Sequence, residues 1–197
     1  MNDGPPVVAR PAATVILLRD SASGFEVLLV KRNPAARFMG GAWVFPGGAL
    51  QPPLERGQRG LHAAALRELS EEAGIRLPAD TELVPLSRWI TPAEVRIRFD
   101  TWFLLARVEA DCEARVDGEE VVEARWYAPA RALAAGRAGE ITLVFPTIKN
   151  LEELTRFDTA AELIADARLR EIRPVLPRVR EGGRGERILL PGEPGYD

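Results

Sequence analysis

One segment, Gly60–Ala73, constrains the fold of this chain more than any other. At about 100° per residue, five of its side chains form a stripe that can pack on a sheet. This stripe consists of His62, Ala65, Leu66, Leu69 and Ala73. Gly74 follows at the position where a glycine commonly ends a helix. The segment therefore predicts a helix with one face packed against a sheet, and His62 is expected on that core side.

The same helix carries three carboxylates. Glu68, Glu71 and Glu72 fall together opposite the packing stripe, because residues three and four apart share a helix face. Carboxylates within one turn repel each other, and a hard divalent cation removes that cost, since oxygen ligands suit Mg²⁺ or Mn²⁺. A solvated acidic face is the simpler interpretation of an isolated triplet, so the surrounding sequence has to decide.

Strands are expected on both sides of this helix. Ala12–Arg19 and Phe25–Arg32 are apolar runs joined by turn residues, which predicts a hairpin. A short strand at Ala42–Phe45 precedes the breaker Pro46-Gly47-Gly48, and residues 49–59 are expected to form a loop. Both faces of the apolar strand Phe99–Val108 should be buried. Further strands are expected at Glu82–Trp89 and Val121–Tyr127, helices at Pro129–Ala135, Pro146–Phe157 and Thr159–Arg168, and a hairpin from Ile172–Arg180 and Arg187–Leu190.

This order of strands and helices predicts the α/β class, with a mixed sheet flanked by helices rather than a doubly wound parallel sheet. The chain has 197 residues, which suits one domain over 1–197. We expect residues 1–11 to form an extended N-terminal segment. Residues from about 146 to 197 should form a C-terminal appendage of helices and a hairpin.

Composition excludes several classes of protein. The net charge is −3, so no basic field is available to bind a nucleic-acid polymer. The chain has one cysteine and one histidine, which excludes an internal disulfide and a His/Cys zinc site. No run of eighteen apolar residues and no leader-like start are present, so we expect no membrane span and a cytoplasmic location.

Gly47-Gly48 and the run Arg67-Glu68-Leu69-Ser70-Glu71-Glu72-Ala73-Gly74-Ile75 resemble the Nudix box. The resemblance implies an α/β/α sandwich around a mixed sheet and a diphosphohydrolase activity. It also implies Mg²⁺ or Mn²⁺ bound by Glu68, Glu71 and Glu72, together with the backbone carbonyl of Gly47. Arg67 would be an ion-pair partner that orients the metal-binding carboxylates.

The sequence departs from the box between the glycines and the helix. The family places a glutamate six residues after the glycine pair and eight before the arginine, where this chain has Leu54 and Arg59. The connection is therefore about five residues longer than usual. Glu55 is a candidate to replace the missing acid.

The flanks resemble one branch of the family. Arg32, Arg37, Gly41 and Phe45–Gly48 match in register the motif that precedes the box in coenzyme A diphosphatases, whereas Val30, Asn33 and Pro34 depart from it. Guanidinium groups bind phosphate bidentately, so Arg32 and Arg37, with Gly47 and Gly48, are the predicted substrate-binding residues. Charges at a solvated strand end are the simpler alternative. Trp89–Pro92, Arg98–Phe103 and Phe145–Ile148 are similar to the peroxisomal acyl-coenzyme A diphosphatases and their bacterial relatives.

The expected reaction is attack of a metal-activated water on one phosphorus of a diphosphate in a small, nucleotide-like substrate, at an outward-facing site between Gly47 and Glu72. The sequence does not assign the general base among the three box glutamates. A further acid before the late strand is common in the family, and Glu119, Glu120 and Glu123 are the candidates.

Other substrates and another class of function stay open. A nucleotide sugar, a dinucleoside polyphosphate or a damaged nucleoside triphosphate would suit the same chemistry. A catalytically silent Nudix domain that senses a ligand is the alternative from another class, and the three intact box carboxylates argue against it. A homodimer is expected by analogy with related enzymes.

Overall fold

The computed structural model describes residues 7–51, 57–182 and 185–196. Its elements run in the following order: β1 (Arg10–Ser21), β2 (Gly24–Arg32), β3 (Ala42–Val44), β4 (Gly47–Ala49), α1 (Gly57–Ala73), β5 (Val84–Ile90), β6 (Phe99–Val108), β7 (Val121–Tyr127), α2 (Pro129–Arg137), β8 (Thr142–Leu143), α3 (Phe145–Leu154), α4 (Ala160–Ala167), β9 (Pro174–Val175), β10 (Arg178–Gly182) and β11 (Gly185–Leu189).

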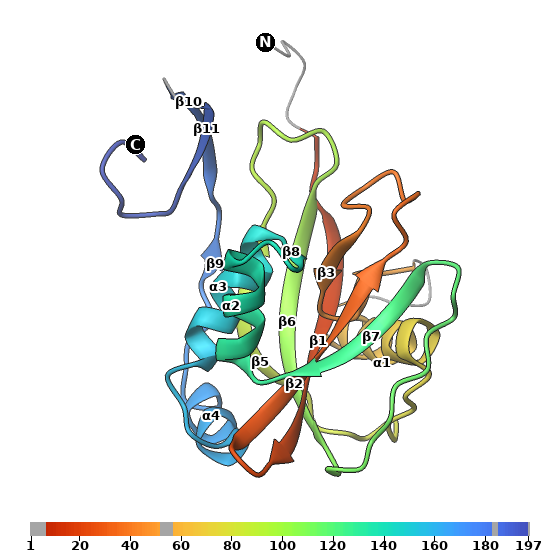
Figure 1. Cartoon of the computed structure of the whole chain (residues 1–197). Coiled ribbons are helices and arrows are strands. Elements are labelled where there is room, and N and C mark those ends of the chain that lie inside the picture. The colour runs from red at the N-terminus through yellow and green to blue at the C-terminus, as the bar shows by residue number, and fades with distance from the viewer. Residues whose placement is uncertain (1–6, 52–56, 183–184, 197) are drawn as a thin grey trace.

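In the described parts of the chain, nine strands form one mixed sheet (Figure 1). The order along the sheet is β8-β3-β2-β1-β6-β5-β9, and β4 and β7 pair with β1 and β2 respectively. The β1–β2 hairpin is antiparallel, as expected, while β1 and β6 run parallel at the centre. The tail hairpin is also confirmed: β10 and β11 form a separate two-stranded sheet.

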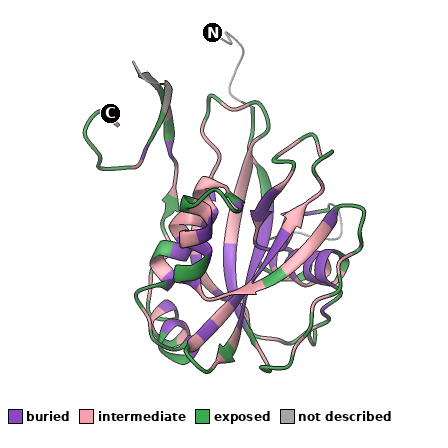
Figure 2. Ribbon diagram, in the orientation of Figure 1, coloured by how far each residue is buried: buried purple, intermediate pink, exposed green. Residues whose placement is uncertain are grey.

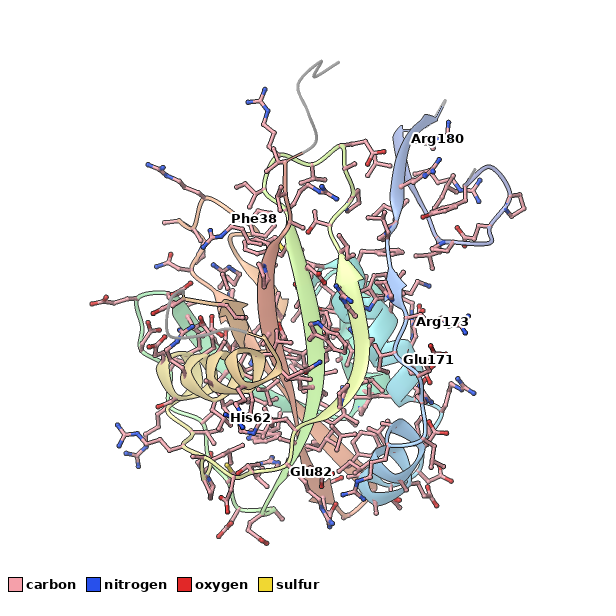
Figure 3. The ribbon with its side chains drawn as sticks, turned by 180° about the vertical axis from the view of Figure 1, so that it is seen from behind. Phe38, His62, Glu82, Glu171, Arg173 and Arg180 are labelled. Carbon is pink, nitrogen blue, oxygen red and sulfur yellow. The ribbon has the colours of Figure 1, made fainter. Side chains whose placement is uncertain are left out.

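Helices cover both faces of the large sheet, which confirms the predicted α/β sandwich. Helix α1 lies on one face, and α2, α3 and α4 lie on the other (Figures 1 and 3). Strand β6 shows the two layers best. Phe103 and Leu105 belong to the core cluster under α2–α4, and Leu104 and Ala106 belong to the cluster under α1. Both faces of this strand are therefore buried, and Figure 2 shows buried residues concentrated in the central strands.

Helix α1 ends as predicted but packs with a different face. Gly74 follows it with a φ of +66°, the left-handed conformation that favours glycine. The buried side of the helix comprises Gly60, Leu61, Ala64, Ala65, Glu68, Leu69, Glu72 and Ala73. The prediction that the glutamates lie opposite the packing stripe was thus wrong for Glu68 and Glu72. Two adjacent rows of residues spaced four apart face the sheet together, namely 61-65-69-73 and 64-68-72.

Several elements also differ from expectation. The prediction that Pro46-Gly47-Gly48 interrupts the strands was wrong for the two glycines. Gly47–Ala49 forms β4, which is an antiparallel partner of β1. Helix α1 begins at Gly57, within the predicted loop. Strand β8 was not predicted, since a two-residue strand carries no detectable alternation. Strand β9 lies within the predicted hairpin arm Ile172–Arg180, but it pairs with β5 and not with the tail hairpin. None of the described helices is long and apolar enough to cross a membrane.

Candidate functional site

The candidate site centres on Glu72, near the carboxyl end of α1. Its side chain is 2% exposed. The backbone N–H of Gly47 donates a hydrogen bond to Oε2 at 2.9 Å, and a guanidinium nitrogen of Arg32 lies 3.9 Å from Oε1. Burial raises the pKa of Glu72 to about 8, against the lowering effects of the Gly47 N–H and Arg32. A carboxyl group buried this deeply requires either a proton or a cation beside it.

Glu68, one turn earlier, lies against the same short strand. It is 9% exposed, and Arg67 Nη1 donates to its Oε1 at 2.7 Å. Burial raises its pKa, although the arginine acts in the opposite direction. Glu71 differs, because its side chain is 58% exposed and only its Oε2 is held, by Arg67 Nη1 at 2.9 Å. Two of the three predicted ligands are therefore buried, and one faces solvent.

Arg67 connects α1 to β4. Besides contacting Glu68 and Glu71, it donates from Nη2 to the carbonyl oxygen of Ala49 at 3.2 Å. One guanidinium therefore fixes two carboxylates relative to the glycine strand. This geometry fits the orienting role implied by the family resemblance, and the role itself stays a prediction.

The two glycines of β4 allow this close approach. A Cβ on Gly47 would lie 2.4 Å from Thr14 Oγ1 and 2.6 Å from the carbonyl oxygen of Ala13. A Cβ on Gly48 would lie 2.3 Å from Glu68 Oε1. A side chain at Gly47 would meet the backbone of β1 and push β4 away from it, whereas one at Gly48 would displace the Glu68 carboxylate. Gly47 is thus required for packing, and Gly48 for the position of Glu68.

The structure separates the two arginines that the sequence grouped. Arg32 ends β2 inside the acidic cluster, where its Nε donates to the carbonyl oxygen of Phe38 at 3.3 Å and its Nη2 lies 3.4 Å from Glu120 Oε1. Arg37 is exposed on the following loop and forms no hydrogen bond or ion pair with the residues that the structure describes. Arg32 is occupied by the acids, whereas Arg37 is available to a ligand.

Of the three candidate acids, Glu119 and Glu120 precede β7 and Glu123 lies on it, and Glu120 is nearest the site. It pairs with Arg32 and raises the pKa of both Glu68 and Glu72. Glu119 is exposed, and its backbone carbonyl accepts from Asn33 Nδ2 at 2.7 Å.

Glu123, the third of these acids, pairs with Lys31 and Arg125. Sequence reasoning missed Asp117, whose carboxylate accepts the backbone N–H groups of Glu120 and Val121 at 3.0 and 2.9 Å. The Asp-Gly pair at 117–118 was the available signal, because Asp in a turn binds backbone N–H groups two to four residues on.

The donor set suits a hard divalent cation. Carboxylate oxygens of Glu68, Glu71 and Glu72, with backbone carbonyls of the glycine strand, are ligands that Mg²⁺ and Mn²⁺ prefer. Across the described ranges, no three acidic, His or Cys side chains already converge as a ligand group. Instead, Arg67 and the Gly47 N–H occupy carboxylate oxygens. The predicted replacement acid Glu55, and Leu54, lie outside the described residues.

His62 lies away from these acids. It is half-buried, and its Nε2 is 2.7 Å from the carbonyl oxygen of Thr81. It lines a hollow of about 560 Å³ together with Leu83 and Leu104, and none of the described residues around that hollow is a carboxylate. The expected outward-facing site is wrong in one respect, because Glu72 is buried rather than facing solvent.

Comparison with known proteins bears on this site. The protein "Putative nudix hydrolase 7" of Caenorhabditis elegans is 27% identical, over 75% of this chain and 61% of its own length. A Nudix hydrolase from Alicyclobacillus acidocaldarius superposes with a TM-score of 0.71 at 26% identity, covering 80% of this chain and 96% of that one.

The Nudix domain of Shewanella oneidensis NrtR, solved with ADP-ribose, has a TM-score of 0.60 at 19% identity and covers 79% and 93% of the two chains, so it shares the fold. The NUDIX domain family model matches residues 8–145, which include β4, α1 and every acid of the site. That span is more than half of the chain, and the protein therefore belongs to the NUDIX domain family.

Proposed function

We propose that this protein is a metal-dependent hydrolase that cleaves a diphosphate linkage in a small, nucleotide-like molecule. The observation that carries the proposal is the burial of Glu68 and Glu72 against the glycine strand β4. Buried carboxylates cost stability unless a cation compensates them. In the sequence they stand where the Nudix box has glutamates, and the proposed metal site gives that cost a chemical purpose.

In this proposal Glu68, Glu71 and Glu72, with the carbonyl of Gly47, hold Mg²⁺ or Mn²⁺. The bound metal would neutralise phosphoryl charge and lower the pKa of water. The chain's own groups prepare the site: Arg67 aligns two carboxylates, and the Gly47 N–H fixes Glu72. The family in general uses divalent metal ions, which supports the assignment.

Glu120 is our candidate for the additional loop acid. Arg32 holds it beside Glu72, and the turn at Asp117 fixes its backbone. A carboxylate in this position can accept a proton from a water molecule near the substrate phosphorus. Glu123 pairs with Lys31 and Arg125 instead, and the exposed Glu119 side chain forms no hydrogen bond or ion pair with the described residues of the site.

For the substrate we propose coenzyme A or an acyl derivative. Arg37 supports this choice, because it is exposed and uncommitted among the described side chains, one loop away from Arg32 and the acids. An arginine in this place can bind the 3′-phosphate of coenzyme A bidentately. The Shewanella domain binds ADP-ribose, and a C. elegans Ap4A hydrolase shares the fold. ADP-ribose and Ap4A are therefore the first competitors to test.

The decisive experiment measures Mg²⁺-dependent hydrolysis of coenzyme A, dephospho-coenzyme A, ADP-ribose and Ap4A, with and without a chelator. Coenzyme A should give 3′,5′-ADP and 4′-phosphopantetheine. Arg37→Ala should lower kcat/KM for coenzyme A about tenfold to a hundredfold, and leave dephospho-coenzyme A nearly unchanged. Arg131→Ala is the matched control, since Arg131 is an exposed arginine on α2, in the other layer.

The outcomes separate the levels of the proposal. Equal losses on both substrates, or a preference for ADP-ribose or Ap4A, would reject the coenzyme A assignment and keep the diphosphate hydrolase. Tight binding of a nucleotide without any Mg²⁺-dependent turnover would favour a silent, ligand-sensing domain.

We also propose that residues 1–197 form a single Nudix domain, that the protein forms a homodimer and that it is located in the cytoplasm. Sedimentation of the purified protein tests the homodimer, and imaging of the tagged protein tests the location.

A further inference from the structure

The α1 face of the sheet carries a second polar cluster beyond the acids. Arg88 on β5 forms a bidentate ion pair with Asp100 on β6, with Nε–Oδ1 and Nη2–Oδ2 distances of 2.7 and 2.6 Å. The guanidinium carbon lies 5.2 Å from the ring centre of Trp102. The three side chains therefore form a stack of indole and guanidinium, with a carboxylate at the guanidinium edge.

This stack stands in one row with the candidate site. Gly48 pairs with Ala13, Ala13 with Trp102, and Trp102 with Arg88, across four neighbouring strands. Glu68 contacts the same face at Gly48. Two strand spacings amount to about 10 Å, so Trp102 lies roughly that far from the glycine strand. A ribose with its phosphate bridges a gap of this size.

The stack is accessible from solvent. The side chains of Arg88 and Asp100 are 30% and 22% exposed, and Trp102 is half-buried. The indole N–H of Trp102 is not a buried atom and has no partner among the described residues. Figure 3 looks onto this face and shows β5 and β6 beside α1 rather than beneath it.

We propose that Trp102, Arg88 and Asp100 form the platform that binds the purine base of the nucleotide substrate. The solvent-exposed parts of the Trp102 ring and the Arg88 guanidinium stack on the base, as aromatic rings and arginine planes do in nucleotide recognition. Asp100 uses both oxygens on Arg88, and each oxygen keeps a second lone pair. That acceptor capacity selects a base with an exocyclic amino group, and adenine therefore binds better than hypoxanthine.

The alternative is that the stack only stabilises the sheet edge. A partly exposed ion pair contributes little to stability. If the role of this pair were solely structural, its removal would change neither stability nor nucleotide binding appreciably. The chain contains a matched control for this alternative. Arg19 pairs with Glu26 and lies 4.3 Å from the ring centre of Trp126, with exposures of 18% and 27% for the ion pair.

This control stack lies far from the acids. Arg19 is five residues beyond Thr14 on β1, and Thr14 pairs with Gly47. Five residues of extended strand span about 17 Å. Changes at Arg19 and Glu26 therefore test the same chemistry at a distance from the proposed substrate position.

The test measures binding of ADP, inosine 5′-diphosphate and UDP to the full chain by calorimetry, with Ca²⁺ in place of Mg²⁺. Wild type should bind ADP at least fivefold more tightly than inosine diphosphate, and UDP more weakly than either. Trp102→Leu should weaken ADP binding about tenfold, within the range known for base stacking on an aromatic ring. Asp100→Asn should reduce the preference for ADP over inosine diphosphate to about twofold or less, because the amide presents a donor as well as an acceptor.

Glu26→Gln should change neither affinity nor base preference. Equal binding of ADP and inosine diphosphate by wild type would overturn the proposal, as would equal effects of Asp100→Asn and Glu26→Gln. The inference rests on the proposed nucleotide hydrolase, but the two fail separately. A base preference without turnover refutes the hydrolase alone, and turnover without a base preference refutes the platform alone.

Discussion

The two faces of the central sheet bury different chemistry. Under α2, α3 and α4, the buried residues that the structure describes are uncharged, and the polar Asn150 is satisfied by Ser87 Oγ at 2.6 Å and the Pro146 carbonyl at 2.9 Å. Under α1, the buried set includes Glu68 and Glu72. The layer under α2–α4 therefore contributes to stability throughout. In the layer under α1, the burial of two carboxylates away from water costs part of the stability.

This difference locates function without reference to any ligand. A carboxylate in an apolar core is costly, and proteins retain it where its charge or proton is used. Both buried glutamates lie on the helix side that faces the glycine strand, where Gly47 and Gly48 admit them. The comparison predicts that changes under α1 affect turnover, whereas changes under α2–α4 affect stability.

The largest expected effect is on turnover. Glu72→Gln should lower kcat for the diphosphate substrate about a thousandfold or more, because a lost metal ligand removes several kcal/mol of charge stabilisation. Glu71→Gln should do the same from an exposed position. Glu72→Gln should unfold at or above the wild-type temperature, since glutamine needs no buried charge. Glu71→Gln should change the unfolding temperature little, because Glu71 is exposed and its ion pair with Arg67 contributes little to stability.

Steady-state kinetics and circular dichroism measure the two effects. Glu162→Gln on α4 is the control, because Glu162 is an exposed glutamate in the other layer. Near-wild-type turnover of Glu72→Gln, while a chelator still inhibits the wild type, would remove Glu72 from the metal site.

The second expected effect separates the layers through two fully buried leucines. Leu151→Ala on α3 and Leu69→Ala on α1 should each lower the free energy of unfolding by about 2–5 kcal/mol. Only Leu69→Ala should also lower kcat of the folded protein, because a cavity under α1 moves Glu68 and Glu72. Urea denaturation gives the stability, and kcat is compared at a temperature where both variants are folded. Equal kcat in the two variants would show that the site tolerates movement of α1.

The third effect concerns pH. Burial raises the pKa of Glu72 to about 8, above the value of 4.5 for an unperturbed glutamate. The folded state therefore keeps a proton that the unfolded state loses, and stability decreases as pH rises between these two values. Between pH 5 and 8 this contribution is on the order of 3 kcal/mol.

Denaturation of the metal-free protein across this range checks the sign and size of the pH effect. Glu72→Gln is the comparison, because it should remove that part of the slope and leave the contributions of other groups. Mg²⁺ should reverse the trend, because it favours the ionised carboxylate. Identical pH slopes for wild type and Glu72→Gln in chelator would contradict the assignment.

Much of this architecture could be predicted because its signals are local. The bounds of β6 and β7 were predicted to the residue, and Gly74 marked the end of α1. The two strands have a regular pattern of apolar residues, and α1 is followed by a glycine in the left-handed conformation. The β1–β2 hairpin followed from its turn residues in the same way.

The remaining features depend on tertiary contacts. Gly47 and Gly48 have the local preference of breakers, and they form β4 because β1 pairs with them on one side and α1 approaches on the other. The rotation of α1 about its axis was misjudged because carboxylates were assumed to face solvent. Arg32 and Arg37 look equivalent in the sequence, and only the fold of the loop between them brings one to Glu72.

The smallest expected effect concerns His62, which lies on α1 but outside the acidic cluster. Its Nε2 is 2.7 Å from the carbonyl oxygen of Thr81, so it ties the helix to the segment before β5. Such a hydrogen bond contributes about 0.5–1.5 kcal/mol to stability. His62→Gln should lower the free energy of unfolding by no more than this amount and leave kcat unchanged. Thermal melts and kinetics on one preparation measure both quantities. A large fall in kcat at an unchanged melting temperature would place His62 in the chemistry, and the division of α1 into a catalytic side and a packing side would have to be redrawn.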